Sequence, residues 1–484
     1  PTLAEVNKFI WWMKGSPFTS SENLDAFLEW AGGLGVTDFP PHLPLDRSAS
    51  SCLGHCLAVS YFPNAGGRGL GAVRALRRGE MVLRVPKAAL ITSECLLQND
   101  NTLAAAVRGY KSLTATQVLS VCLLYEISKG KGSPWYPYMM TLPRSYDLLA
   151  TFNELERRAL QVEDAIYAAE NHRSKLKLQW EEATSLLEEL ALPKRFRSFK
   201  AWIWVSSTIS SRTMHVGWDT AGCLCPVGDL LNYAAPDDEQ DDDVIEHMTD
   251  GVFVEKYESY CFFARKSYHK GEQVVDHCEQ DSCKKKVKRC FIICCLFQVL
   301  LRYGTYTNLE LLEHYGFLLR LNPNDKVFLP LESDMESLIL WPRESMFIHP
   351  DGKPSFALSA LLRKWATPPV LRKSIKQLAE CGCQISAENE IKVLTWILSQ
   401  CYVILSLLPT TVEADDILLS AIEKAESINE IQEIRKIMNN HGIILAEGET
   451  IKSLDKLKLA VIWRCEYKKI VDNCISFCKK SMQH

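Results

Sequence analysis

Four glycines lie within the six residues 66–71, between apolar segments that are too short to form helices. Across residues 57–86 apolar and polar side chains alternate in short runs, and this alternation is typical of β-strands. Glycine at such density lets the backbone approach a ligand closely, but it also suits a plain turn between two strands. The sequence therefore predicts a β-region that holds either a ligand-binding loop or a turn.

The residues after the glycines argue against a dinucleotide-binding loop. In that fold a helix opens directly after the glycines, and its N-terminus holds the pyrophosphate. Here the apolar run 72–76 is followed by the turn-like residues 77–80 and by a second apolar run at 81–86. We interpret residues 72–86 as a β-hairpin rather than as the start of a helix.

Helical patterns surround this β-region. Apolar residues recur in them at intervals of three and four, as on the buried face of an amphipathic helix. The expected helices span residues 21–36, 102–109, 114–128, 152–190, 199–211, 356–364, 388–408, 414–440 and 450–480. Further strands are expected within residues 200–270, notably at 252–265. Residues 1–20 are weakly patterned, and we expect them to be poorly ordered.

The composition excludes several classes of protein. A chain of 484 residues, 47% hydrophobic and 24% charged, is typical of globular proteins with more than one domain. The net charge of −4 argues against general nucleic-acid binding, which needs a basic surface. The apolar runs 290–301 and 393–408 are short or are broken by Gln and Ser, below the roughly 18 to 20 residues that cross a membrane. We interpret both runs as buried elements.

Cysteine is frequent, with 18 residues, but no secretory signal pattern opens the sequence. We therefore expect reduced thiols and an intracellular protein, in the cytoplasm or the nucleus, or in the chloroplast if a transit peptide precedes this sequence. The close pairs that we expect to be buried or free thiols are Cys52 and Cys56, Cys223 and Cys225, and Cys381 and Cys383. No metal site is expected.

Three further motifs follow the glycines in chain order. They are Gly228-Asp229-Leu230-Leu231-Asn232-Tyr233; Tyr268-His269-Lys270-Gly271-Glu272-Gln273-Val274; and Tyr303-Gly304-Thr305-Tyr306-Thr307-Asn308, continued by Leu311-Leu312-Glu313-His314-Tyr315-Gly316-Phe317. Together with the glycines they resemble the SET domain of protein N-methyltransferases of the Rubisco large-subunit methyltransferase type. The segments Trp135-Tyr136-Pro137-Tyr138, Leu142-Pro143 and Ser211-Arg212 resemble the same subgroup.

The resemblance covers residues 21–480 and implies an α+β fold. The family has a SET β-core with a helical insert, followed by an all-α substrate-binding domain. On this likeness we expect a SET domain at 21–322 with a helical insert at about 88–200, and a helical substrate-binding domain at 323–484. The turn-rich Asn322-Pro323-Asn324-Asp325 marks the expected boundary.

The resemblance also implies the cofactor, S-adenosylmethionine, and its site. The implied cofactor-binding residues are Arg68, Gly69, Leu70, Gly71, Arg212, Asp229, Asn232, Tyr233, Tyr315 and Phe317. Arg212, Asp229 and Asn232 are implied to lie near the carboxylate, amino and ribose ends of the cofactor. Tyr303 stands at the position of the catalytic tyrosine, and Tyr315 and Phe317 would help to wall the lysine channel. The family usually has Asn-His where this chain has Asn232-Tyr233, which puts the hydrogen bond of that histidine in doubt.

The implied reaction is methylation of a protein lysine. Methyl transfer from a sulfonium to an amine is a direct displacement, which needs alignment and a neutral amine more than an acid or a base. An apolar aromatic channel favours the neutral amine, because desolvation lowers the pKa of an ammonium. Histidine N-methylation and a non-catalytic, SET-derived binding module are the alternatives. We expect a monomer with a protein substrate and no direct contact with nucleic acid or membrane.

Residues 274–298 interrupt the family pattern. In the family the strand that ends Gly-Glu-Gln-Val runs almost directly into the Tyr-Gly motif, whereas here 25 residues separate Gln273 from Val299. Our hypothesis is a short intron retained in frame, which sequencing of the transcript would test. A zinc site and a nuclear-import signal are weaker alternatives, because the five cysteines of this segment form no paired Cys-x-x-Cys units. The acidic run 237–243 suits a solvated loop, or a surface that attracts a basic substrate.

Overall fold

The computed structural model of the chain forms two compact units. It describes residues 21–39, 51–62, 67–233, 251–264, 267, 297–298, 300–301, 305–424, 434, 436–438 and 453–483. The first unit comprises Pro1–Tyr146 and Ser174–Gly304, and the second comprises Asp147–Arg173 and Thr305–His484. This division does not fall at the predicted boundary near residue 322, because residues 147–173 and 305–322 pack with the C-terminal helices. The predicted limits of the SET domain at 21–322 and of the substrate-binding domain at 323–484 stay a prediction.

Several predicted segments lie outside the described residues. They are the N-terminal residues 1–20, the acidic run 237–243, the motif at 268–274 and most of the predicted insertion 274–298. Of that insertion the structure describes Phe297–Gln298, which form strand β9.

The glycine-rich segment is itself a strand. Strand β2 (Gly67–Ala72) pairs antiparallel with β1 (Leu57–Phe62) on one edge and with β9 on the other. Ser60 stands opposite Gly69, and Gly71 stands opposite Gln298. The prediction that no helix follows the glycines is confirmed. Glycine inside a paired strand marks a place where a ligand or another backbone can come close.

The predicted hairpin over residues 72–86 is wrong. Strand β3 (Met81–Pro86) pairs with β8 (Ser259–Phe263), which pairs in turn with β7 (Gly251–Val254). Strand β2 cannot accept β3, because β1 and β9 already occupy both of its edges. The turn before β3 is tied instead to the end of β8, since Gly79 and Glu80 exchange backbone hydrogen bonds with Ala264.

The helices predicted for the first unit are confirmed. They are α2 (Ser21–Gly33), α4 (Asn101–Arg108), α5 (Ala115–Lys129) and α9 (Phe199–Arg212), with α3 (Ser93–Asn99) and the short α6 (Tyr136–Met139) in addition. Thr114 begins α5 with a capping box that includes Gln117, and Ser198 caps α9 by accepting from the backbone N–H of Ala201. The long α8 (Glu163–Glu189) contains the division between the two units.

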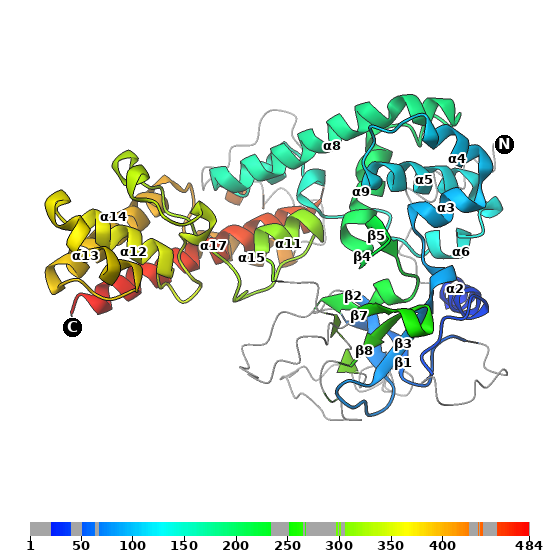
Figure 1. Cartoon of the computed structure of the whole chain (residues 1–484), viewed down its shortest axis with the longest axis horizontal. Helices are drawn as coiled ribbons and strands as arrows, with labels where there is room; N and C mark the ends of the chain where they lie inside the picture. Colours follow the sequence, from blue (N-terminus) through cyan, green and yellow to red (C-terminus); the bar gives the residue numbers. More distant parts are fainter. Residues whose placement is uncertain are drawn as a thin grey trace. The chain divides into compact units, whose positions relative to one another are not determined.

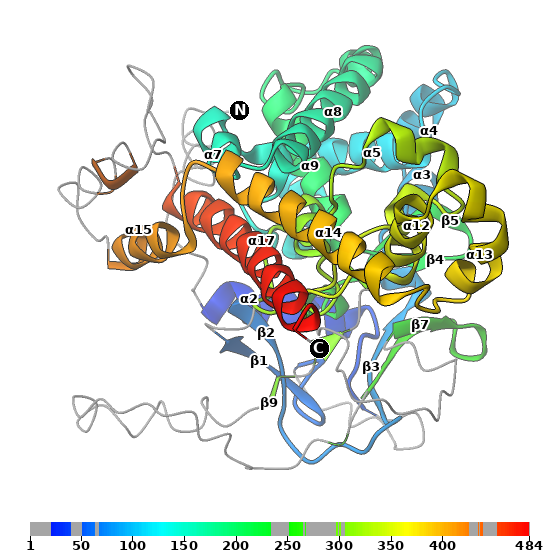
Figure 2. The same cartoon turned by 90° about the vertical axis from the view of Figure 1, so that its left-hand side faces the viewer.

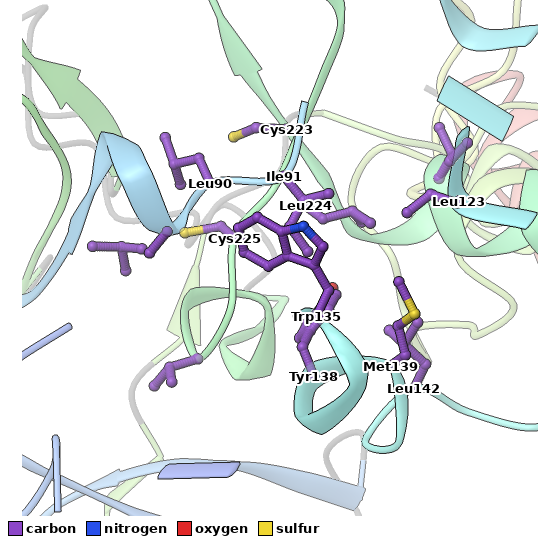
Figure 3. Packing of buried hydrophobic residues seen from close by; sticks show 14 of the residues in the cluster. Leu90, Ile91, Leu123, Trp135, Tyr138, Met139, Leu142, Cys223, Leu224 and Cys225 are labelled. Atoms are coloured by element: carbon purple, nitrogen blue, oxygen red, sulfur yellow. The ribbon is translucent and has the colours of Figure 1, made fainter. Parts of the chain in front are cut away.

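The core of the first unit joins these helices to the strands. After α9 the chain forms the hairpin β4 (Thr213–Val216) and β5 (Asp219–Leu224). Figure 3 shows part of this core, in which Trp135, Tyr138 and Met139, at and within α6, lie with Leu90, Ile91, Leu224 and Cys225. Because α6 is only four residues long, this burial rather than its own hydrogen bonds holds it in place.

The second unit is mostly helical, as predicted. Its helices are α7 (Glu154–Arg158), α11 (Asn308–His314), α12 (Phe356–Ala366), α13 (Arg372–Glu380), α14 (Ala387–Leu407), α15 (Val412–Lys424) and α17 (Leu454–Ser481). Isolated β-bridges join residues 327, 348 and 354. Helix α14 lies beside α17 in both views of the molecule (Figures 1 and 2), and the two helices share one hydrophobic core with α12.

A buried ionic cluster ties α15 to α17 in the second unit. Both oxygens of Asp415 are used: Arg464 donates to Oδ1 and Lys468 to Oδ2, each at 2.7 Å. Arg464 also donates to the carbonyl of Ala159, and Lys468 to the hydroxyl of Thr410. All three charged side chains are buried, so one carboxylate faces two cations away from water. Burial lowers the pKa of Lys468, while the charge of Asp415 acts in the opposite direction.

The apolar run at 393–408 is only partly buried. Within α14, residues such as Val393, Ile397 and Cys401 lie in the core, whereas Tyr402 and Leu407 are exposed. Among the described helices α14 alone is long and apolar enough to cross a membrane by length and composition, and 28% of that stretch is buried. A core helix of a soluble protein meets the same criteria, so the absence of a membrane span stays a prediction.

Candidate functional site

The central glycine strand and the Asp229-Asn232 motif meet in the first unit. Asn232 lies in the short strand β6 (Asn232–Tyr233), and its side-chain amide donates to the backbone carbonyl of Arg68 at 3.4 Å. Strand β10 (Leu300–Leu301) pairs parallel with β6, so that Leu300 stands opposite Asn232. This pairing brings the chain that leads to Tyr303 alongside β6. Tyr303 itself lies outside the described residues, as does the side chain of Tyr233.

Gly228 fixes the backbone just before Asp229. A Cβ at Gly228 would lie 2.6 Å from Cζ of Phe262 and 2.7 Å from Sγ of Cys225, closer than real Cβ atoms approach other heavy atoms. Only glycine therefore lets the 3₁₀ turn Gly228–Leu230 press against β8. The preceding Val227 has a φ of 70°, a left-handed conformation that is costly for a β-branched residue. The turn is thus held by packing, and it presents Asp229 from a fixed position.

Asp229 is held by two donors from distant parts of the first unit. Nη1 of Arg212, at the end of α9, donates to Oδ2 of Asp229 at 2.9 Å. The hydroxyl of Tyr138, on α6, donates to the same oxygen at 2.8 Å. The side chains of Arg212 and Asp229 are 18% and 2% exposed, so the ion pair is largely shielded from solvent.

Electrostatics keeps Tyr138 and Arg212 each in one protonation state. Burial is the largest single influence on Arg212 and lowers its pKa, but the charge and hydrogen bond of Asp229, together with Tyr146 and Tyr138, more than offset burial and raise the pKa of the guanidinium. Burial, followed by the negative charge of Asp229, raises the pKa of Tyr138 well above its usual value. Burial and the nearby charge of Arg212 lower the pKa of Arg68. At neutral pH Tyr138 is therefore a phenol that donates, and Arg212 is a cation.

The network has groups left over that fit the amino-acid end of S-adenosylmethionine. Nε of Arg212 is buried and donates to no described residue. Oδ1 of Asp229 accepts no hydrogen bond from a described residue, because both donors reach Oδ2. Arg68 adds a second guanidinium, whose Nη2 donates to the carbonyl of Thr141 at 2.8 Å. A free N–H with two cations suits a carboxylate, and a free carboxylate oxygen suits an ammonium.

The aromatic candidates Tyr315 and Phe317 belong to the second unit. They follow α11, which Thr307 caps with Glu310. The rings of Tyr315 and Phe317 lie 6.1 Å apart, and Tyr306 meets Tyr315 edge-on at 5.6 Å. Gly316 between them has a φ of 77°, and a Cβ there would lie 3.0 Å from the backbone of Asp147. The Tyr-Gly-Phe motif therefore requires its glycine, and it clusters three aromatic rings.

The structure thus gathers seven of the predicted site residues in the first unit. These are Arg68, Gly69, Leu70, Gly71, Arg212, Asp229 and Asn232. The sequence did not predict the hydrogen bond from Tyr138 to Asp229, although Tyr138 lies in one of the segments that resemble the family. The residues next to Tyr138 indicate a tyrosine after a proline, but they do not indicate a hydrogen-bond partner that lies 91 residues away. Among the described residues no three His, Cys, Asp or Glu side chains are grouped to hold a metal ion.

The comparisons with known proteins decide the family. A family model described as Rubisco LSMT substrate-binding matches residues 353–471. The chain is 45% identical to Protein SET DOMAIN GROUP 40 of Arabidopsis thaliana, over 96% of this chain and 97% of that protein. The chain belongs to the SET-domain methyltransferase family of the Rubisco LSMT type. Members of this family use S-adenosylmethionine as their methyl donor.

More distant relatives and solved structures of similar fold also match this SET family member. The actin-histidine N-methyltransferase of Mus musculus is 24% identical over 73% of this chain, which spans 59% of that relative's length. A crystal structure of the SET domain of LSMT bound to lysine and AdoHcy matches with a TM-score of 0.59 and 17% identity, over 96% of this chain and 93% of that one. A structure of Rubisco LSMT bound to AdoMet matches with a TM-score of 0.56 and 17% identity, over 97% of this chain and 93% of that chain. These likenesses show that the α+β SET fold with its helical C-terminal domain is the fold of this chain.

Proposed function

We propose that this SET protein is an S-adenosylmethionine-dependent protein-lysine N-methyltransferase. The observation that carries the proposal is the buried Arg212–Asp229 pair beside β2, in which neither Nε of Arg212 nor Oδ1 of Asp229 bonds to a described residue. The solved structures of similar fold support it, since one of them is bound to lysine and AdoHcy and another is bound to AdoMet.

The residues of the site have separate tasks in this proposal. S-adenosylmethionine, when bound, supplies a methyl group on a sulfonium. Arg212 and Arg68 attract the carboxylate of its amino-acid end, and Oδ1 of Asp229 accepts from the ammonium. Tyr138 and Arg212 hold Asp229 so that this oxygen is not free to rotate away. Because the pKa values of Tyr138 and Arg212 are both raised, the two donors keep their protons at neutral pH and can orient the cofactor through Asp229.

Histidine methylation is the second candidate, and one observation favours it. The actin-histidine N-methyltransferases of several vertebrates are 24–26% identical to this chain over about three quarters of its length. A lysine must lose a proton before it can accept a methyl group, whereas a neutral imidazole is already an acceptor near neutral pH. The two acceptors therefore give different pH dependence as well as different products.

The test is calorimetric titration of S-adenosylmethionine into the full chain and into a variant that lacks residues 274–298. Binding by either protein is the expected result, and methyl transfer to lysine peptides but not to histidine peptides would identify the acceptor. Transfer to histidine alone would overturn the lysine assignment and support the second candidate. Binding by neither protein would overturn both and favour a non-catalytic binding module.

A further inference from the structure

A pocket in the second unit has no part in the site described above. It lies between the first turn of α8, the start of α11, the segment 325–328 and one face of α17, and its cavity volume is about 90 Å³. The residues that give it its chemical character are Asp164, Asp325, Phe328, Trp463 and Tyr467. All of them lie in the second unit, so the pocket does not depend on how the two units are arranged.

Aromatic rings form one wall of this pocket. Trp463 and Tyr467, one turn apart on α17, stack with their ring centres 5.5 Å apart and their planes at 29°. Phe328 is 44% exposed, although it is a large apolar side chain. Ring faces of this kind attract cations, because their electron density is greatest above and below the plane.

Two carboxylates in the pocket form no ion pair with any residue that the structure describes. Asp164, in the first turn of α8, is exposed and forms no ion pair with a described residue. Asp325 accepts from the backbone N–H and the side-chain amide of Asn308, which are neutral donors. The ammonium of the adjacent Lys326 is found 4.7 Å from the ring centre of Phe347.

The surroundings of Asp325 raise its pKa. Burial raises the pKa of Asp325 to about 7, and the charges of Glu466 and Glu310 act in the same direction while the bonds from Asn308 oppose them. Among the described residues, the charges that act on Asp325 are those of Glu310 from α11 and Glu466 from α17, and Glu466 is itself paired with Lys469 at 3.0 Å. Asp164 from α8 and Lys326 line the same pocket. This balance is negative overall, so a cation that entered would be stabilised.

We propose that this pocket binds a cationic side chain, arginine or lysine, of the protein substrate. The inference rests on the proposed function only in taking the ligand to be part of a protein substrate. Rings and unpaired carboxylates together suit a guanidinium or an ammonium. An anion would meet two carboxylates, and a neutral apolar group would desolvate them without compensation. The pocket would then bind a basic residue of the substrate that is separate from the methylated residue.

The first experiment uses Nα-acetyl-L-arginine methylamide as the probe and the full chain as the protein. Arginine is chosen because a lysine probe could also enter the methyl-acceptor channel. The citrulline analogue has nearly the same shape but carries no charge, and it serves as the neutral control. Ligand-observed NMR should detect binding of the arginine probe and little or none of the citrulline analogue.

Matched variants locate the binding. Asp164→Asn and Asp325→Asn should each weaken arginine binding by about fivefold, because each removes one carboxylate from the pocket. Glu163→Gln is the control, since it makes the same charge change at an exposed neighbouring residue that does not line the pocket. The arginine probe should also bind more tightly as the pH rises through about 7, and Asp325→Asn should abolish that step.

Equal binding of the arginine and citrulline probes, or equal weakening by Glu163→Gln and Asp164→Asn, would overturn the proposal. Asp164 is exposed, so its variant keeps the test valid even if Asp325→Asn fails to fold. Titration of S-adenosylmethionine into the same variants separates the two proposals. Lost arginine binding with intact cofactor binding supports the pocket, whereas absent cofactor binding with intact arginine binding would overturn only the proposed function.

Discussion

Tyr138 and Asp229 are joined by a 2.8 Å hydrogen bond, although 91 residues separate them in the sequence. The oxygen that accepts from Tyr138 also accepts from Arg212, so a short helix from the predicted helical insert takes part in holding the candidate cofactor site. The insert is therefore connected directly to the site, and substitutions in it should change cofactor binding.

The substitution Tyr138→Phe tests this connection. It removes the hydroxyl and keeps the ring, so the loss is confined to the bond with Asp229. We expect the free energy of unfolding to fall by about 1–2 kcal/mol, because hydrogen bonds to charged groups are worth more than neutral ones. Affinity for S-adenosylmethionine should fall by about fivefold, since Asp229 is less firmly oriented. Chemical denaturation and calorimetry measure the two effects.

Tyr136→Phe is the matched control for that substitution. Tyr136 lies on the same helix and is partly exposed, and its hydroxyl bonds to no described residue. The control should leave both stability and affinity nearly unchanged. If the two variants behaved alike, the bond between Tyr138 and Asp229 would have no role in holding the site.

Gly228→Ala tests the close approach of the turn to β8. The added Cβ would meet the ring of Phe262, which is 1% exposed and cannot move into solvent. We expect a loss of about 1–3 kcal/mol in the free energy of unfolding from overpacking, together with weaker cofactor binding as Asp229 shifts. The double variant with Phe262→Leu should recover part of the stability. An alanine variant as stable as the parent protein would contradict this account of the turn.

The buried cluster around Asp415 predicts losses of stability of very different size for two substitutions. Asp415→Asn leaves Arg464 and Lys468 buried without a counter-charge, and we expect a loss of about 3–5 kcal/mol. Lys468→Met removes one of the two cations and restores a one-to-one pair, so its cost should be no more than about 1 kcal/mol. Urea denaturation of both variants measures the difference. Equal losses would show that the charge balance is not what matters.

The raised pKa of Asp325 predicts how the stability of the protein depends on pH. Its pKa is raised from 3.8 to about 7 in the folded protein, so the folded state holds the proton more tightly than the unfolded state. The stability that Asp325 contributes is therefore fully present below about pH 4, falls as the pH rises and is lost above about pH 7. Denaturation of the parent protein and of Asp325→Asn between these values should show a declining difference. A difference independent of pH would contradict the raised pKa.

Much of the local structure could be predicted from the sequence. The capped starts of α5 and α9 and the amphipathic pattern of α12 and α17 have their cause within a few residues, in capping side chains and apolar spacing. The strands at residues 57–86 were likewise recognisable from their alternation. Their pairing was not, because β3 meets β8 from a segment about 180 residues later, and no local pattern encodes that partner.

By itself the sequence determined the family, the position of most helices and the residues that gather around β2, because motif chemistry and apolar periodicity are written in neighbouring positions. Only the tertiary structure decided that Tyr138 binds Asp229, that residues 147–173 and 305–322 join the C-terminal helices, and that Asp164 and Asp325 share a pocket with Trp463. Each of these depends on which surfaces meet when separate segments bury their apolar faces together. That outcome is a property of the packed chain, in which free energy is gained by contacts between residues far apart in sequence.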